Sequence, residues 1–302
     1  MASSGAGAQR WEVIEGALRV RFPGLRAMMT EGPGHASELW PRGARARAGT
    51  VLSVGGDGTT NEVLCGFVDE QGSNRFPEAV LAVLAAGTGG DFQRMFGRVR
   101  VERQVERLCA AAVRTVDYGV AHFKDAQGQA RVRPFLNVAS VGVSGEVVRR
   151  VNGSDSQLGP TLKYLLGSLQ GIARWRNVQV LARRDGGDER RIDLTLGIVA
   201  NGQYFGAGMW VCPDAAIDDG QFDCIEVAGM SRQTLIATLA KVFDGKHLRV
   251  RGVEHARARS VEFTPVWERA EVPIEIDGEQ VGFLPGRFEL RVGALKLRVA
   301  AR

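Results

Sequence analysis

The sequence lacks the cysteine and histidine patterns that a zinc site or a disulfide framework requires. Its four cysteines and four histidines are scattered, with no Cys-x-x-Cys pair and no His-x-x-x-His. Both kinds of site depend on such residues in recognisable spacings. We therefore expect four reduced thiols, which is usual in a cytoplasmic protein.

Long apolar runs are missing as well. No segment approaches the roughly 20 apolar residues that cross a bilayer, and residues 1–9 lack the apolar core of a signal peptide. The net charge of +5 is spread along the chain, which disfavours a nucleic-acid partner and suits an anionic substrate or membrane. We expect a cytoplasmic protein without a transmembrane segment that associates with membranes only transiently.

What the sequence does contain is enough apolar material for two domains. Hydrophobic residues make up 44% of the 302 residues, so a sizeable core can form. The first 115 residues alternate between helical and strand patterns. Helices are expected at 11–22, 36–48, 61–68 and 101–113, and strands at 25–29, 50–54 and 80–84. This alternation favours a mostly parallel sheet covered by helices.

The pattern changes after about residue 116 to a series of strands. They are expected at 132–140, 177–183, 191–200, 221–227, 257–263, 272–276, 286–292 and 295–300, with helices at 161–175 and 232–243. Consecutive strands separated by turn residues favour an antiparallel β-sandwich. The sequence therefore predicts an α/β domain followed by a mainly β domain.

Two glycine loops, each with an acid, follow the strands at 50–54 and 80–84. Residues 55–62 read Gly-Gly-Asp-Gly-Thr-Thr-Asn-Glu, and residues 87–92 read Gly-Thr-Gly-Gly-Asp-Phe. Glycines let the backbone approach a phosphate, and a helix N-terminus offers free N–H groups. The alternative is a plain strand-to-helix turn capped by a threonine. Because neighbouring parallel strands end at one edge of a sheet, we expect the two loops to face each other.

Two acidic turns lie in the second half of the chain. Residues 213–223 include Asp218 and Asp219 ahead of a glycine, and such a turn can hold a hard cation or form a simple hairpin. Residues 277–279 read Asp-Gly-Glu, which commonly signals a hairpin. A carboxylate there could instead accept a proton from a substrate hydroxyl that faces a bound phosphate. The residues alone leave both alternatives open.

Taken in order, these motifs and the stretch at 201–208 resemble the diacylglycerol kinase catalytic-domain superfamily. It includes bacterial soluble diacylglycerol kinases, YegS-like lipid kinases, and sphingosine and ceramide kinases. The loop at 55–59 is also similar to that of NAD kinases and phosphofructokinases, so the motifs at 87–92, 201–208, 213–220 and 277–279 discriminate. The resemblance runs from about Ser4 to the C-terminus.

The resemblance implies a nucleotide-binding α/β domain of the NAD-kinase and phosphofructokinase type at 1–117, with segment 290–302 returning to it. A β-sandwich domain for the lipid substrate is implied at 118–289. The implied reaction is transfer of a phosphoryl group from ATP, with Mg2+, to a lipid hydroxyl in phospholipid metabolism. Diacylglycerol is the default acceptor, and ceramide or a sphingoid base is the competitor. The partner would be a lipid at the membrane surface, and a homodimer is left open.

The resemblance also implies roles for individual residues. The nucleotide would contact residues of the loops and of the chain's start, namely Ser4, Gly5, Thr30, Gly55, Gly56, Asp57, Gly58, Thr59, Asn61, Glu62, Gly87, Thr88 and Asp91. Asp57, Asp91 and Asp117 would form a charged network. Asp219, with the backbones of Ala216 and Gln221, would bind a structural magnesium ion. The catalytic base would be Asp277, which we favour, or Glu279.

Three departures from the family pattern stand out. The family's opening strand and Asn-Pro are absent and only Ser4-Gly5 remains, so we expect an upstream extension or a sheet that is one strand short. Gly90 replaces an asparagine, and Asp155 and Gln157 stand where some members have a lysine. Two alternatives therefore remain. One is a soluble-metabolite kinase of the NAD-kinase type, and the other is a catalytically impaired homologue that binds nucleotide or lipid.

Overall fold

The structure is a computed structural model that describes residues 5–44, 49–86, 90–97, 99, 101–153 and 159–300. The chain forms two compact units, which are described separately. Unit 1 comprises Met1–Val116 and Gly293–Arg302, and unit 2 comprises Asp117–Val292. These bounds lie close to the predicted divisions at residues 117 and 290. No helix in the described part of the chain is long and apolar enough to cross a membrane.

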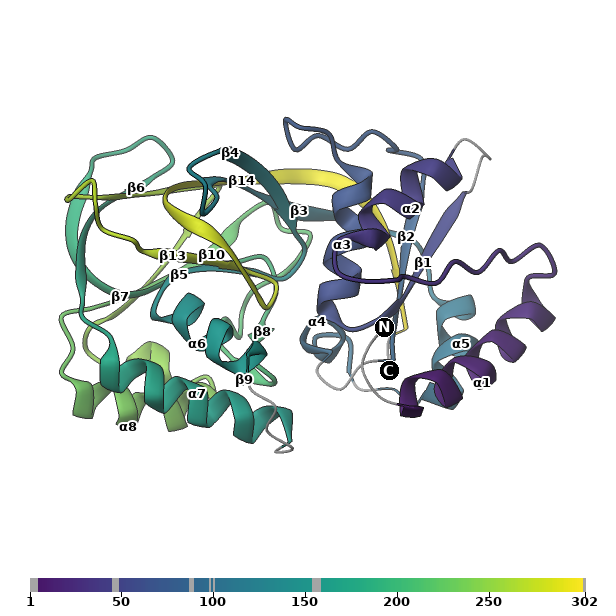
Figure 1. Cartoon of the computed structure of the whole chain (residues 1–302), viewed down its shortest axis with the longest axis horizontal. Helices are drawn as coiled ribbons and strands as arrows, with labels where there is room; N and C mark the ends of the chain where they lie inside the picture. The colour runs from purple at the N-terminus through teal and green to yellow at the C-terminus, as the bar shows by residue number, and fades with distance from the viewer. Residues whose placement is uncertain are drawn as a thin grey trace. The chain divides into compact units, whose positions relative to one another are not determined.

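Unit 1 is a short parallel sheet covered by helices (Figure 1). Strand β2 lies between β1 and the last residues of β14 and runs parallel to both. The strands are β1 (Thr50–Gly55), β2 (Val80–Ala85) and the end of β14 (Glu279–Val299). The helices are α1 (Gly5–Arg21), α2 (His35–Ala44), α3 (Asp57–Phe67), α4 (Asp91–Arg94) and α5 (Val101–Ala110). The predicted α/β architecture is confirmed.

Apolar contacts hold the helices of unit 1 to its sheet and to one another. Ile14 and Leu18, one turn apart on α1, pack with residues of α5 and β2. Trp40 of α2 stacks on Phe67 of α3, with ring centroids 5.1 Å apart. The predicted strand at 25–29 is wrong, because this segment is irregular. Pro-Gly precedes it and Gly-Pro-Gly follows it, and such residues favour turns over a paired strand.

Unit 2 is built from antiparallel strands. The strands are β3 (Arg114–Lys124), β4 (Ala130–Phe135), β5 (Val138–Gly142), β6 (Val178–Arg184), β7 (Arg190–Ala200), β8 (Tyr204–Phe205), β9 (Met209–Trp210), β10 (Phe222–Ala228), β11 (Val253–Ala258), β12 (Ser260–Pro265) and β13 (Pro273–Ile276). Strands β5, β13, β14, β12, β6 and β7 pair in that order, and β7 returns to β5. The ladder therefore closes on itself like a barrel, with β10 and β11 continuing from β7.

Large apolar side chains fill the interior of unit 2. Phe135 stacks on Phe222 at 5.5 Å, and both are fully buried. The helices are α6 (Val143–Asn152), α7 (Pro160–Arg174), α8 (Arg232–Val242) and the 3-10 helix η1 (Lys246–Arg249). Several of them pack in a second cluster against β7 and β10. The predicted antiparallel β domain is confirmed.

Candidate active site

The first glycine loop joins β1 directly to α3. Gly55 ends the strand, and Gly56 is the N-cap of the helix without any side-chain capping bond. A Cβ on Gly55 would lie 2.6 Å from the hydroxyl of Thr59, whereas a Cβ on Gly56 would meet none of the described residues within 4 Å. The loop is therefore packed on one residue and open at the next, which leaves the N-terminus of α3 accessible to an anion.

The carboxylate of Asp57 ties the first loop to the start of α4. Its Oδ2 accepts a hydrogen bond from the backbone N–H of Asp91 at 2.8 Å, and its Oδ1 accepts one from Phe92 at 3.2 Å. Asp91 is itself buried and accepts a bond from Arg94 Nε at 3.0 Å. The structure thus brings Asp57 and Asp91 together, as the loop pattern predicts.

Burial raises the pKa of Asp57 above its ordinary value of 3.8. The two backbone N–H groups and the positive charge of Arg94 oppose that shift without cancelling it. A carboxylate in this state is stabilised by any cation that reaches it. The cation that accompanies ATP phosphates would therefore fit beside Asp57.

Two other residues of this loop have structural contacts. Both oxygens of the Glu62 carboxylate accept backbone N–H groups at the start of α2, from Gly34 at 2.8 Å and Ala36 at 3.2 Å. Asn61 is 1% exposed, and its Oδ1 lies 3.7 Å from the Cys65 thiol. Glu62 therefore caps a helix, and nucleotide contacts of both residues stay predictions.

The remaining residues predicted to bind the nucleotide lie near the start of the chain and in the second glycine loop. Thr30 lies in the irregular segment before α2 and is half-buried, and Gly5 is the first residue of α1 rather than part of a loop. Ser4, Gly87 and Thr88 lie outside the described residues. Gly90 begins the described part of the second loop and caps α4 with φ of +62°, a backbone conformation that glycine adopts without strain.

The third acid of the predicted network belongs to unit 2. Asp117 is 1% exposed, and its Oδ2 accepts the backbone N–H of Gly220 at 2.8 Å. Its own N–H donates to the carbonyl of Ile217 at 2.6 Å. Asn201 also contacts this residue, because its Nδ2 donates to the carbonyl oxygens of Leu136 and Asp117. Asp117 therefore holds the acidic turn, and its place in a network with Asp57 and Asp91 stays a prediction.

The predicted magnesium turn exposes the carboxylate of Asp219. Asp219 Oδ1 accepts the backbone N–H of Gln221 at 3.1 Å, and its Oδ2 lies 3.4 Å from Arg257 Nη1. Among the described residues no group of three or more His, Cys, Asp or Glu side chains converges as a metal site would. A cation here would depend on backbone oxygens such as those of Ala216 and Gln221, and it would compete with Arg257.

The Asp277 turn joins β13 to β14. Asp277 has φ of +45° and Gly278 has φ of +92°, values typical of a tight hairpin turn. The Asp277 carboxylate accepts three backbone N–H groups, at 2.9–3.2 Å from Leu136, Asn137 and Val138. These donors fix the direction of the carboxylate. Glu279 is 39% exposed and forms an ion pair of 2.6 Å with Arg133 Nη2.

Sequence reasoning missed Glu275, which is buried beside this turn and accepts the N–H of Gly278 at 2.6 Å. The sequence feature that could have indicated its burial is a single acid between Ile274 and Ile276 in an otherwise apolar strand. Alternation alone would place such a residue in solvent.

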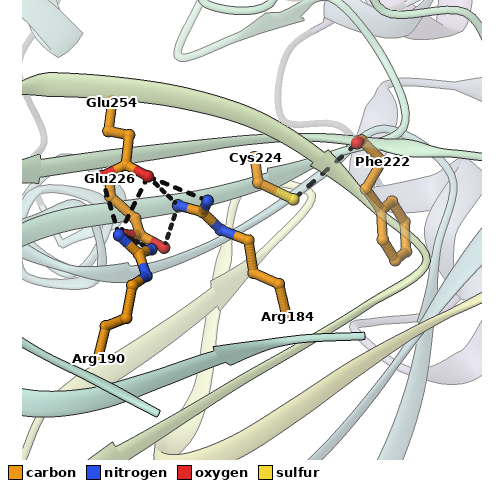
Figure 2. A network of polar contacts seen from close by, with 6 residues as sticks. All are labelled: Arg184, Arg190, Phe222, Cys224, Glu226 and Glu254. Carbon is orange, nitrogen blue, oxygen red and sulfur yellow. Dashed lines mark hydrogen bonds and ion pairs between the residues drawn. The ribbon is translucent and has the colours of Figure 1, made fainter. Parts of the chain in front are cut away.

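A second group that sequence reasoning missed is a polar network on β6, β7, β10 and β11 (Figure 2). The buried carboxylate of Glu226 lies 2.7 Å from Arg184 and 2.8 Å from Arg190. Glu254 approaches the same two arginines at 3.0 Å. Burial lowers the pKa of Arg184, but the charges and hydrogen bonds of both glutamates raise it above its ordinary value. The network crosslinks four strands.

Comparisons with known proteins bear on this arrangement. Residues 1–121 match the model described as "Diacylglycerol kinase catalytic domain", and residues 137–299 match "YegS C-terminal NAD kinase beta sandwich-like domain". The chain belongs to the diacylglycerol kinase family of lipid kinases. It is therefore a kinase, and the family implies the use of ATP.

Individual relatives cover most of the chain. It is 30% identical to a "Diacylglycerol kinase" of Bacillus subtilis over 79% of this chain and 73% of that protein. It is also 30% identical to a "Probable lipid kinase YegS-like" of Chromohalobacter salexigens, over 97% and 90%. A crystal structure of a diacylglycerol kinase from Bacillus anthracis covers 97% of this chain and 91% of its own, with TM-score 0.73 and 22% identity. That structure supports the fold alone.

Proposed function

We propose that this lipid kinase transfers the γ-phosphoryl group of ATP to a hydroxyl of diacylglycerol. Unit 1 would bind the nucleotide and unit 2 the lipid. The contact of Asp57 with the backbone of Asp91 and Phe92 supports this most, because it gathers two acids where neighbouring parallel strands end. A relative named diacylglycerol kinase aligns over 79% of the chain, which favours diacylglycerol over ceramide or a sphingoid base.

The proposed phosphate site is the uncapped N-terminus of α3. Its free N–H groups and the positive end of the helix dipole attract an anion. The open space at Gly56 would let a phosphate approach the backbone closely. Asp57 and Asp91 would hold the magnesium ion that neutralises charge on the phosphates.

The proposed base is Asp277. The three N–H donors on its carboxylate orient it. Phosphoryl transfer tolerates a weak base, because its loose transition state needs little activation of the attacking hydroxyl. Glu279 stays the alternative, since its carboxylate is more exposed.

We propose the Asp219 turn as a structural magnesium site, formed by one carboxylate and the backbone oxygens of Ala216 and Gln221. Magnesium should then raise the melting temperature of the parent chain, and Asp219→Asn should reduce that shift. The measurement is thermal unfolding with magnesium and with a chelator. An equal magnesium shift in parent and variant would remove the assignment.

The test of the reaction is transfer of radiolabelled phosphate from ATP to a panel of acceptors. The panel contains diacylglycerol, ceramide and a sphingoid base in mixed micelles, and NAD in solution. We expect diacylglycerol to be the preferred acceptor. Labelling of NAD instead would favour the soluble-metabolite alternative, and the absence of any labelled product would contradict the proposed function.

Asp277→Asn should lower kcat about 100-fold or more, because it removes the proton acceptor and keeps the side-chain shape. ATP affinity should stay near that of the parent chain, measured with a fluorescent nucleotide analogue. The matched control is Asp125→Asn, since Asp125 also accepts backbone N–H groups in a hairpin turn of unit 2. Equal activity of the two variants would contradict the assignment of Asp277.

A further inference from the structure

A buried carboxylate stands two residues before the proposed base. Glu275 of β13 is 1% exposed. Its Oε1 accepts a hydrogen bond from the N–H of Gly278 at 2.6 Å, and its Oε2 accepts one from the hydroxyl of Ser140. Ser140 is also fully buried and lies 2.8 Å from the hydroxyl of Ser144 at the start of α6. One side chain thus connects the turn to β5 and α6.

The strand pairing explains why a charged residue is buried here. Strand β13 lies between β14 and β5, and its register with β14 shifts between Ile274 and Glu275. All four residues of β13 are buried, so both faces of this strand are covered. On the other side, Glu275 is directly opposite Ser140 of β5, so the two side chains share one face of the sheet.

The turn that follows has a backbone that needs support. Asp277 and Gly278 both have positive φ, which is uncommon for a residue with a Cβ. The Asp277 carboxylate is held by the backbone of the β4–β5 connection, whereas the N–H of Gly278 is held by Glu275. The backbone of the β4–β5 connection and the Glu275 carboxylate therefore hold adjacent residues of the same turn.

We propose that Glu275 is a positioning residue for the kinase reaction. By accepting the N–H of Gly278 while anchored on Ser140, it fixes the directions of the Asp277 and Glu279 carboxylates. The inference rests on the proposed function, because it assumes that this turn serves phosphoryl transfer. Glu275 would affect the reaction by holding the turn in place, without touching the substrate itself.

Two substitutions can distinguish the positioning role of Glu275, which depends on its hydrogen bonds, from an electrostatic role of its negative charge. An ionised carboxylate only accepts, so Ser140 donates to Glu275 and Ser144 donates to Ser140. In Glu275→Gln the amide oxygen can still accept from Gly278, and the amide nitrogen can donate to Ser140, which then donates to Ser144. Glu275→Met has a similar length and makes neither bond. The glutamine variant keeps the hydrogen bonds to Gly278 and Ser140 without the charge, and the methionine variant removes both hydrogen bonds.

The experiment combines steady-state kinetics with hydrogen exchange of the turn. Glu275→Met should lower kcat about 100-fold, the scale of a small misplacement of a catalytic group. Its KM for ATP should change little, and the Gly278 amide should exchange faster. Glu275→Gln should keep kcat within about fivefold and preserve the protection. Glu226→Gln changes a buried carboxylate of another network in unit 2 and should leave kcat unchanged.

Each outcome decides the proposal. Equal losses of kcat in the glutamine and methionine variants would assign the effect to charge and overturn it. Parent-like kcat or exchange in Glu275→Met would overturn it too. If Glu275→Met does not fold, Ser140→Ala removes only the anchor, and slower turnover with faster Gly278 exchange is then expected. If Ser140→Ala has the kcat and the Gly278 exchange rate of the parent chain, the positioning role of Glu275 is overturned.

The failure of the proposed function would look different. In that case the parent chain would phosphorylate no lipid. The exchange of the Gly278 amide in the variants would still report whether Glu275 holds the turn.

Discussion

Two regions of the molecule bury a carboxylate, and they treat its charge in opposite ways. In unit 1, burial raises the pKa of Asp57, and two backbone N–H groups and Arg94 compensate only in part. In unit 2, the Glu226 carboxylate lies between the guanidinium groups of Arg184 and Arg190 (Figure 2). The first charge is only partly compensated by its surroundings, whereas the second is paired with two arginines.

This difference agrees with the proposed ligand site in unit 1 and with a structural ion-pair network in unit 2. A partly compensated carboxylate in a glycine loop costs stability, and such groups concentrate at functional sites. A buried carboxylate between two arginines costs stability when one partner is removed. Substitutions in the two regions should therefore have opposite effects on activity and stability.

The largest effect is expected from Asp57→Asn. We expect kcat/KM to fall about 1,000-fold, because the variant loses the charge that would hold magnesium on the phosphates. The free energy of unfolding should change by less than about 1 kcal/mol, since removal of a poorly compensated charge offsets the loss of one N–H acceptor. The measurements are the ATP-to-lipid assay and urea unfolding.

A matched acid in unit 1 controls for the change of charge. Asp69 accepts the backbone N–H groups of Gln71 and Ser73 in an exposed turn. Asp69→Asn should leave kcat/KM at the level of the parent chain. If Asp57→Asn instead loses much stability and keeps its activity, Asp57 has a structural role. The contrast between Asp57 and Glu226 would then be wrong.

The next largest effect is expected from Arg184→Met, which breaks the network of unit 2. Glu226 would keep only Arg190, and leaving a buried carboxylate half-paired should cost about 3 kcal/mol of unfolding free energy. The activity per folded molecule should not change. Urea unfolding and the kinase assay below the unfolding midpoint measure the two quantities.

The neighbouring Arg183 provides the control. It pairs with Glu189 at 2.7 Å, and both side chains are well exposed, so Arg183→Met should cost less than about 1 kcal/mol. If both substitutions cost the same, Glu226 is not held by Arg184 in the way the structure indicates.

The sequence predicts the parts of the fold that rest on local patterns. Glycine loops after two apolar strands predict the neighbouring ends of β1 and β2 and the meeting of Asp57 with Asp91. Apolar spacing predicts α1, α7 and α8. Strand boundaries are less accurate, because the predicted strand at 132–140 is β4 and β5, and the two predicted at 286–292 and 295–300 are the single strand β14.

Long-range pairing is what the sequence does not predict. Glu226 and Arg184 are 42 positions apart, and only the register of β6, β7 and β10 brings them together. Glu275 is buried because both faces of its strand, β13, are covered. Helix α6 and strand β3 were also missed, although the valines of α6 recur at helical spacing in the sequence.

The smallest expected effect is a difference between the two regions in how their carboxylates change stability with pH. The pKa of Asp57 in the folded chain lies above 3.8, so the folded state takes up the proton first as the pH falls. Asp57 therefore destabilises the fold at neutral pH, and this cost disappears as the pH falls through the raised pKa toward 3.8. Asp57→Asn should show no such gain on acidification.

Glu254 should give the opposite slope. Burial raises the pKa of Glu254, but hydrogen bonds and charges of Arg190 and Arg184 lower it below its ordinary value of 4.5. Its contribution is present above 4.5 and is lost as the pH falls through the lowered pKa. Because its side chain is 51% exposed, Glu254→Gln should cost less than about 1 kcal/mol at neutral pH. Urea unfolding from neutral to acidic pH measures both differences from the parent, and slopes of the same sign would mean that the two regions do not treat a carboxylate charge differently.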